Sequence, residues 1–326
     1  MIPFEVKHVS SVEQAISASR SGARYIAGGT TLFDLMREEV ETPTQLVDIN
    51  ALPLDYIREE QDGLVIGGLA RMSDVAASDV VKRHHPLLSE SLIEGASPQL
   101  RNMASIGGNL LQRVRCPYFR MLDAACNKRL PGSGCSALDG ANAGCAILGT
   151  SEHCIATHPS DMAVTLVAMD ATMRVRGADG DREFPVEELF RLPESTPHLE
   201  HALKPGELII EVRIPFGRYT RRARYLKVRD RASYEFALVA TAAALDIDDG
   251  VIREARVACG GVGTRPWRMR AVENLLAGRR PGRDAFEAAG ATAVAGATAR
   301  EGNGYKIPLL SRTVTRALEL ALEVPA

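Results

Sequence analysis

The stretch YIAGGTTLFDL, residues 25–35, places two glycines between a short apolar segment and a helical pattern. Tyr25 to Ala27 suit a strand, and Leu32 and Leu35 recur at helical spacing after it. Glycine lets a backbone approach an anion closely, and a helix N-terminus offers free N–H groups. The stretch therefore predicts a strand, turn and helix able to hold a phosphate. A tight turn without a ligand explains the same glycines, and neither GxGxxG nor GxxxxGK[ST] occurs, which disfavours an ordinary Rossmann or Walker site.

The residues around this stretch complete a small β-α-β unit over residues 1–52. Ser10 and Glu13 have the spacing of a capping box, so a helix is expected to begin there. Leu46 to Ile49 form a second apolar run after the helix that follows the glycines. Strand, glycine turn, helix and strand thus follow one another in order.

From residue 53 the pattern changes to a mixed α+β unit over residues 53–215. Its elements are predicted as strands at 64–66, 173–176 and 207–214, and helices at 73–78, 86–95 and 160–171. His84 and His85 precede Pro86, and adjacent residues point apart on a helix, so they are interpreted as a solvated helix start rather than a metal pair.

A boundary is expected near residues 215–222, followed by a C-terminal domain over 216–326. Strands are predicted at 225–228, 237–247 and 251–259, with Asp249-Gly250 as the hairpin turn between the last two. Helices are predicted at 266–277, 284–297 and 311–324. Strands followed by helices indicate an antiparallel sheet with packed helices, and the whole chain is assigned to the α+β class.

Composition excludes several classes of protein. The 326 residues carry 39 basic and 41 acidic side chains, a net charge of −2, so no bulk electrostatics favour nucleic acid or a membrane surface. No apolar run is long enough to span a bilayer. The N-terminus MIPFEVKHVSSVEQ lacks the pattern of a signal peptide, so a cytoplasmic chain is expected from its own sequence.

A second glycine pair, SIGGN at residues 105–109, also lies in an apolar setting. Two separated glycine loops can clamp a pyrophosphate from both sides, with Ser105 and Asn109 as neutral donors.

Together the two motifs resemble the flavoprotein subunit of molybdenum hydroxylases of the xanthine dehydrogenase class. The resemblance rests on AGGTT (27–31) and SIGGN (105–109). It extends to PSDMA (159–163), LIIEVRIP (208–215) and RYLKVRDRASYEFALV (224–239), and so covers nearly the whole chain.

The resemblance implies an FAD site and names its residues. The expected FAD contacts are Ile26, Ala27, Gly28, Gly29, Thr30, Thr31, Leu32, Ser105, Gly108, Asn109, Leu111, Gln112, Ser160, Asp161, Ile209 and Lys227. In this interpretation Ile209 and Lys227 approach the isoalloxazine, where the Lys227 cation stabilises reduced, anionic flavin. Two plainer interpretations stay open: Lys227 as a solvent-facing strand lysine, and Asp161 as the N-cap of the following helix.

Five of the six cysteines crowd into residues 115–155, a glycine-rich segment. Successive cysteines are separated by nine, eight, nine and eight residues, so no CxxC spacing of a zinc ribbon, thioredoxin or ferredoxin occurs. Four thiolates suit a [4Fe–4S] cluster, and zinc would tie down the same segment; spacing alone does not separate the two. Cys259, the sixth, lies in an apolar strand pattern and is expected in the core.

At this segment the chain resembles one branch of the class in particular. Most flavoprotein subunits of the class lack such an insertion, and one branch, that of bacterial periplasmic aldehyde oxidoreductase, carries it with a [4Fe–4S] cluster. That similarity implies Cys116, Cys126, Cys135 and Cys154 as ligands, with Cys145 as a spare thiol.

The resemblance implies an electron-transfer subunit without catalytic residues of its own for the substrate. A large partner subunit would hold the molybdenum cofactor and oxidise an aldehyde, a small one would carry [2Fe–2S] clusters, and FAD here would pass electrons to an external acceptor. A periplasmic location is expected only if a partner subunit with an export signal carries the folded chain across the membrane. The alternatives are the flavin subunit of a 4-hydroxybenzoyl-CoA reductase, a zinc-binding scaffold and a stand-alone flavin oxidase.

Overall fold

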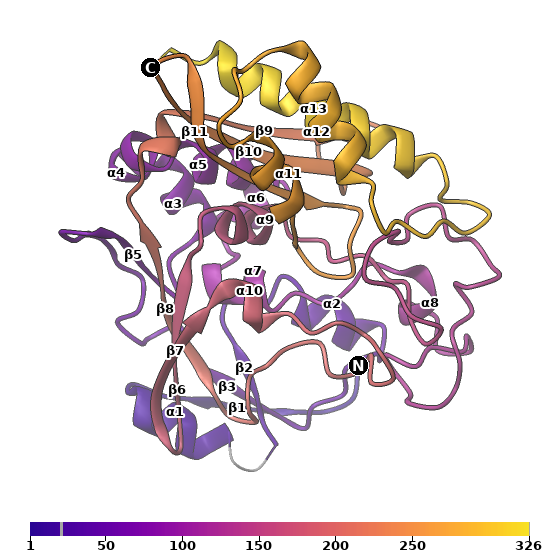
Figure 1. Cartoon of the computed structure of the whole chain (residues 1–326). Coiled ribbons are helices and arrows are strands. Elements are labelled where there is room, and N and C mark those ends of the chain that lie inside the picture. The colour runs from indigo at the N-terminus through magenta and orange to yellow at the C-terminus, as the bar shows by residue number, and fades with distance from the viewer. Residues whose placement is uncertain (20–21, 326) are drawn as a thin grey trace.

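The N-terminal unit is a three-stranded parallel sheet with two helices, in a computed structural model that describes residues 1–19 and 22–325 (Figure 1). Its elements are β1 (Glu5–His8), α1 (Val12–Ser19), β2 (Arg24–Ile26), α2 (Leu32–Arg37) and β3 (Gln45–Asp48). The strand order is β1-β3-β2, and both pairings are parallel. The predicted β-α-β unit is confirmed, with β1 as an additional edge strand.

Helix α1 begins one residue later than predicted. Ser11 Oγ accepts a hydrogen bond from Gln14 N at 3.2 Å, and Gln14 Oε1 accepts one from Ser10 N at 3.0 Å. Ser11 therefore caps the helix in place of Ser10, and Gln14, in place of Glu13, bonds back to the backbone of Ser10.

The second unit is built on a five-stranded antiparallel sheet of order β4-β5-β8-β6-β7. Its elements are β4 (Ile57–Glu59), β5 (Gly63–Gly67), α3 (Met72–Ala77), α4 (Asp79–His84), α5 (Pro86–Glu94), α6 (Pro98–Arg101), α7 (Ile106–Leu110), α8 (Pro117–Arg120), α9 (Asp161–Ala168), β6 (Thr172–Gly177), β7 (Gly180–Pro185), α10 (Val186–Leu189) and β8 (Leu208–Pro215). Strand β8 lies in the middle of the sheet, so the end of this unit returns to pair with its beginning. Strands β4 and β7, missed in the sequence, are the sheet's two edges, where the apolar alternation is weak.

The prediction that His84 and His85 lie at a solvated helix start is wrong. Helix α4 ends at His84 and α5 begins at Pro86, with His85 completely buried between them. The His85 ring stacks on Phe216 with 5.9 Å between ring centroids, and His84 Nε2 lies 3.1 Å from Glu59 Oε1. The junction of two helices is covered by the start of the C-terminal region, which local sequence does not reveal.

The C-terminal region forms a four-stranded antiparallel sheet of order β12-β11-β10-β9. Its elements are η1 (Arg218–Arg221), β9 (Arg222–Val228), β10 (Val239–Asp248), β11 (Val251–Gly260), β12 (Trp267–Arg268), α11 (Arg270–Leu276), α12 (Arg283–Ala293) and α13 (Lys306–Glu323). Asp249 and Gly250 both have positive φ, 51° and 69°, as the predicted two-residue hairpin requires. Cys259 is completely buried in this sheet, which confirms its core assignment.

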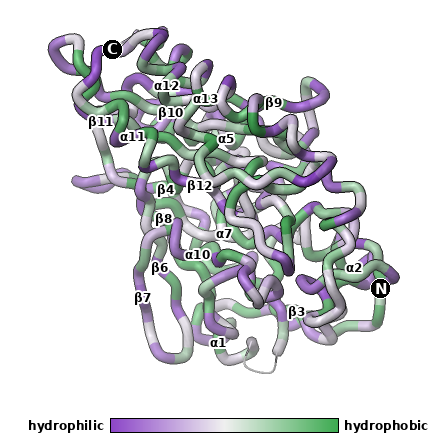
Figure 2. The backbone as a smooth tube through the Cα atoms, turned by 45° about the vertical axis from the view of Figure 1, so that its right-hand side comes forward, coloured by the Kyte–Doolittle hydropathy of each residue, from purple (hydrophilic) through white to green (hydrophobic). Residues whose placement is uncertain are grey.

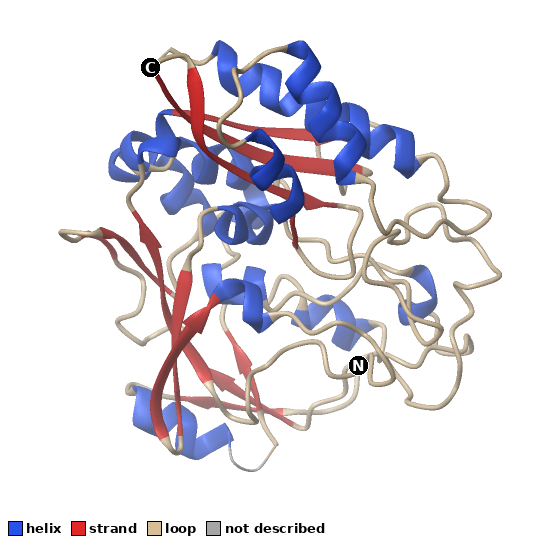
Figure 3. Ribbon diagram, in the orientation of Figure 1, coloured by secondary structure: helices blue, strands red, loops and turns tan. Residues whose placement is uncertain are grey.

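Helices from both halves of the chain cover this sheet. Helices α11 and α13 pack on it directly and α12 packs against both, while α5 and α9 of the second unit pack against β9, β10 and β11 (Figures 1 and 3). Apolar residues concentrate along these interior elements, and the hydrophilic residues gather in the turns (Figure 2). Within the described residues, no helix combines the length and apolarity needed to cross a bilayer.

Candidate functional site

Glycines mark the points where three segments of the backbone touch. A Cβ on Gly28 would lie 1.8 Å from the carbonyl oxygen of Met103, which joins the first glycine loop to the segment before the second. A Cβ on Gly68 would lie 2.4 Å from the carbonyl oxygen of Ile209, and Gly107 in turn approaches Gly68. The two glycine pairs and β8 are thus held together by contacts that only glycine allows.

The first glycine loop keeps its amide donors available. The backbone N–H groups of Gly28 to Thr31 donate to no acceptor among the described residues. Gly29 has φ of 69°, and Thr31, the N-cap of α2, makes no capping hydrogen bond with its side chain. Unsatisfied donors before a helix favour an anionic ligand.

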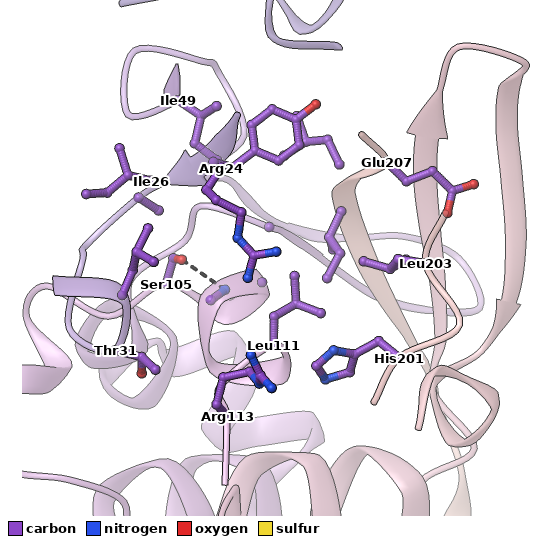
Figure 4. A pocket seen from close by; sticks show the side chains of 18 of the residues that line it. Arg24, Ile26, Thr31, Ile49, Ser105, Leu111, Arg113, His201, Leu203 and Glu207 are labelled. Atoms are coloured by element: carbon purple, nitrogen blue, oxygen red, sulfur yellow. Dashed lines mark hydrogen bonds between the residues drawn. The ribbon is translucent and has the colours of Figure 1, made fainter. Parts of the chain in front are cut away.

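The loop borders a cavity of about 560 Å³, a size typical of cofactor and ligand sites. Figure 4 shows side chains from β2, α2, the α7 segment and residues 198–209 surrounding it. Most of the residues predicted to contact FAD line this cavity: Ile26, Ala27, Gly28, Gly29, Thr30, Thr31, Leu32, Ser105, Gly108, Leu111 and Ile209. Ser105 Oγ caps α7 by accepting from Gly108 N at 3.2 Å, which leaves its hydroxyl proton free to donate.

The other predicted contacts lie outside the lining. Asn109 turns its amide to Met72 Sδ, at 3.2 Å, and accepts from Ser160 Oγ at 2.5 Å. Gln112 Nε2 donates to the Asn109 carbonyl at 3.1 Å. These side chains stabilise the second glycine segment without lining the cavity.

Asp161 and Lys227 form a buried ion pair of their own, with 2.8 Å between Oδ2 and Nζ. The N-cap of α9 is Ser160, whose Oγ accepts from Ala163 N, so the interpretation of Asp161 as the cap is wrong. The Lys227 side chain is 1% exposed, so a solvent-facing lysine is also wrong. Burial raises the pKa of Asp161, and Lys227 and the hydroxyl of Tyr225 oppose that shift.

Charged residues that the sequence did not single out line one side of the cavity. Arg113 pairs with both Glu41 and Glu200, and Arg24 lies 3.7 Å from Glu41. Burial acts to raise the pKa of Glu200, but Lys128 and Arg113 outweigh it and hold that pKa below its ordinary value. Arg113 could have been noticed because it follows the second glycine segment directly; Glu200 lies in an irregular segment with no periodic signal.

The cysteine segment encloses a small hollow lined by Cys116, Cys126, Cys135 and Cys154. Backbone amides aim at these sulfurs: those of Tyr118 and Phe119 at Cys116, those of Ala137 and Ile155 at Cys135, and that of Ala156 at Cys154. The segment is loop apart from α8 (Figure 3), so these contacts fix its shape locally. Cys145 is not part of the lining; its thiol is hydrogen-bonded to that of Cys116.

Protein side chains also hold this segment in place. Arg129 donates to the carbonyl oxygens of Tyr118, Phe119, Leu122 and Ala124. From the C-terminal region, Lys306 Nζ donates to the Gly144 carbonyl at 3.0 Å. Arg129 thus holds the segment together from within, and Lys306 ties it to the C-terminal region.

Residues 2–217 match the family described as the FAD binding domain in molybdopterin dehydrogenase. The chain belongs to this family. Residues 224–320 match the CO dehydrogenase flavoprotein C-terminal domain. The domain limits at residues 52 and 215 stay predictions.

Relatives of the family match the chain along its length. It is 46% identical over 325 residues to the aldehyde oxidoreductase FAD-binding subunit PaoB of Escherichia coli K12, covering 98% of each chain. It is 27% identical to the glyceraldehyde dehydrogenase medium chain of Sulfolobus acidocaldarius, over 86% of this chain and 84% of that one. A solved carbon monoxide dehydrogenase chain from Hydrogenophaga pseudoflava superposes with a TM-score of 0.79 at 26% identity, covering all of both chains.

The cavity fits the FAD expected of this family. It offers free amides at the first glycine loop for a pyrophosphate and an apolar wall that includes Ile26, Leu111 and Ile209 for ring systems. The guanidinium groups of Arg24 and Arg113 extend into it from opposite sides (Figure 4).

Proposed function

We propose that the chain is the electron-transfer FAD and [4Fe–4S] subunit of a molybdenum-containing aldehyde oxidoreductase. The 46% identity to a subunit of that name, over 98% of both chains, supports the aldehyde branch of the family. The cysteine-lined hollow carries the cluster part of the proposal. Four cysteines line one hollow, with backbone amides aimed at three of the sulfurs, and hydrogen bonds of this kind tune the potential of a cysteine-bound cluster.

Two metal groups take four thiolates as ligands, a zinc ion and a [4Fe–4S] cluster. A zinc ion binds four ligands at about 2.0–2.3 Å from a single point. Within the described residues, no group of three or more His, Cys, Asp or Glu side chains converges in a way that could hold one metal ion. In a [4Fe–4S] cluster each thiolate binds a different iron, and the cluster is proposed for the four cysteines because they line one hollow.

Acidic groups that line the cavity form ion pairs with its arginines. Glu41 and Glu200 are both paired with Arg113. Burial lowers the pKa of His201 to about 4, so its ring is neutral near pH 7. These groups are suited to binding and positioning rather than to acid–base chemistry on a substrate. Aldehyde oxidation therefore belongs to a partner subunit with the molybdenum cofactor.

Bound FAD supplies the ability to accept and release electrons, and this chain supplies its position. The first glycine loop holds the pyrophosphate through backbone amides, while α7 and β8 form the apolar wall beside it. Asp161 and Lys227 support the site from outside the lining, where Lys227 remains the proposed cation nearest the flavin ring. A small [2Fe–2S] subunit delivers the electrons, which then leave to an external acceptor.

The test is an anaerobic absorption spectrum with flavin, iron and sulfide analysis on the purified full chain. We expect one FAD with four irons and four sulfides per chain. Serine replacement of Cys116, Cys126, Cys135 or Cys154 should each lower the iron content, whereas Cys145→Ser and the core control Cys259→Ser should retain it. Flavin with zinc and no iron would end the cluster proposal and keep the FAD site. A chain with neither flavin nor iron would overturn both.

An aldehyde turnover assay separates the subunit role from a stand-alone oxidase. The isolated chain should not oxidise aldehydes, and activity should appear only when the molybdenum and [2Fe–2S] subunits are co-expressed with it. Turnover of aldehydes by the isolated chain would contradict the proposal.

A further inference from the structure

The cavity and the cysteine hollow share a wall. Leu35 lines the cavity, is 1% exposed, and packs in one cluster with Cys116, Cys126 and Cys154. Phe119 belongs to the same cluster, and the Arg113 guanidinium lies 4.7 Å above its ring centroid. Because these residues are closely packed, a change in the shape of the hollow should displace side chains of the cavity wall.

A chain of ion pairs also crosses this wall. Arg113, which lines the cavity, pairs through Nε with Oε1 of Glu200. The other carboxylate oxygen of Glu200 lies 3.4 Å from Nζ of Lys128, and Lys128 lines the hollow. The side chains of Arg113, Glu200 and Lys128 are only 19%, 11% and 9% exposed, so solvent screens these contacts weakly.

One nitrogen of Arg113, Nη2, remains available for a ligand. Its Nε and Nη1 are engaged by Glu200 and Glu41, while Nη2 donates to no acceptor among the described residues. The guanidinium enters the cavity opposite Arg24 (Figure 4). A planar cation held on two sides by carboxylates is fixed in orientation, which favours one defined contact with an anionic group.

We propose that Arg113 contacts the bound dinucleotide and that Lys128, acting through Glu200, sets its position, so that the cysteine segment controls FAD binding. The inference rests on the proposed function, because it takes FAD as the ligand of the cavity. Lys128 and Glu200 are positioning residues in this scheme, and Arg113 is the residue that touches the ligand.

The test is titration of the deflavinated full chain with FAD, followed by flavin fluorescence and by the visible circular dichroism of the bound flavin. Lys128→Met removes the far end of the chain of ion pairs without removing a thiol or a cavity residue. We expect it to weaken FAD binding about tenfold, as loss of a buried charge partner does, and to change the dichroism of the bound flavin. Glu200→Gln should also weaken FAD binding and change the dichroism. The double variant should have an FAD Kd no higher than that of the single variant with the lower affinity, because both changes act through Arg113.

Arg213→Met is the matched control. It removes an ion pair with Glu60, of 2.8 Å, that borders neither the cavity nor the hollow. It should leave the FAD Kd unchanged whatever it does to the melting temperature. If Lys128→Met loses iron, Lys128→Arg decides the question: recovery of both iron and FAD affinity supports the inference, and recovery of iron alone overturns it.

The outcomes distinguish this inference from the proposed function. A parent chain that binds FAD, with Lys128→Met within twofold of its Kd at equal iron content, overturns the coupling alone. A parent chain that binds no FAD overturns both.

Discussion

The ammonium nitrogen of Lys227 lies 2.8 Å from Oδ2 of Asp161, with both side chains shielded from solvent. Tyr225 donates to Oδ1 of the same carboxylate at 2.8 Å, and Lys227 also donates to the carbonyl of Glu94 at 3.0 Å. The pair thus fastens α9 to β9 and to the end of α5. Because its charges are paired and hydrogen-bonded, each depends on the other to remain buried.

Removing one charge of this pair and leaving the other should destabilise the protein. Asp161→Asn leaves a buried ammonium without a counter-charge and should lower the free energy of unfolding by about 3–5 kcal/mol. Lys227→Met should cost a similar amount, and the double variant should lose much less than the sum of the two. Urea unfolding of the parent, the two single variants and the double variant measures the coupling. Strictly additive losses of unfolding free energy would show that the two groups do not depend on each other.

Burial of His85 predicts a loss of stability in mild acid. Burial and the neighbouring His84 lower its pKa to about 4, from an ordinary value of 6.5, and a hydrogen bond with the backbone of Ile214 opposes the shift only in part. The unfolded chain therefore binds a proton at a higher pH than the folded one, so stability is full above pH 6.5 and falls between pH 6.5 and 4. His85→Leu should remove about 3 kcal/mol of this decline. The remaining decline should persist, because His158 and His201 are also buried with lowered pKa values; an unchanged pH profile in His85→Leu would contradict the assignment.

Gly28 should not tolerate even a methyl group. A Cβ there would lie 1.8 Å from the Met103 carbonyl oxygen, a backbone atom that cannot move aside cheaply. We expect Gly28→Ala to separate the two glycine segments, lower stability by about 1–3 kcal/mol and weaken FAD binding at least tenfold. Gly282→Ala is the control, since a Cβ at Gly282 meets open space. Melting curves and FAD titration measure both; equal behaviour of the two variants would contradict the close contact.

Arg129 should be needed for iron retention although it is not a ligand. Its two terminal nitrogens reach four carbonyl oxygens of the cysteine segment, a fork that lysine cannot reproduce. Arg129→Lys should lower the protection of residues 117–125 against hydrogen exchange and speed the loss of iron to a chelator. The exposed Arg283, paired with Glu287 on α12, supplies the control Arg283→Lys. Iron loss at the parental rate in Arg129→Lys would show that the segment is held by other contacts.

The glycine pairs could be predicted from sequence because their chemistry is local. A backbone that must touch another backbone needs glycine at that residue, and Gly28 and Gly107 therefore marked the cavity before any fold was known. Long elements with clear periodicity, such as α9 and β10, were equally accessible. The edge strands β4 and β7 were not, because their outer faces are polar and their apolar patterns short.

Partners distant in sequence could not be predicted. Asp161 and Lys227 are separated by 66 residues, and no local pattern relates one to the other. Glu200 and His201 lie in a segment without regular structure, so nothing in their neighbours indicated that they border the cavity. The resemblance named residues by motif, and motif residues such as Asn109 and Gln112 turned out to support the wall rather than form it.

The covering of the C-terminal sheet by α5 and α9 limits how this protein can be recombined. The two family matches meet between residues 217 and 224, which invites exchange of the C-terminal part between relatives. Yet the inner face of that sheet is packed by helices encoded before the junction, and its core residues Ala240, Ala242 and Ala258 share one cluster with Leu88 and Met162. A chimera joined at this point would inherit a mismatched core, whereas one that also transfers α5 and α9 would keep the interface of a single parent. For the same reason the two parts should melt together, in one cooperative transition, rather than as independent modules.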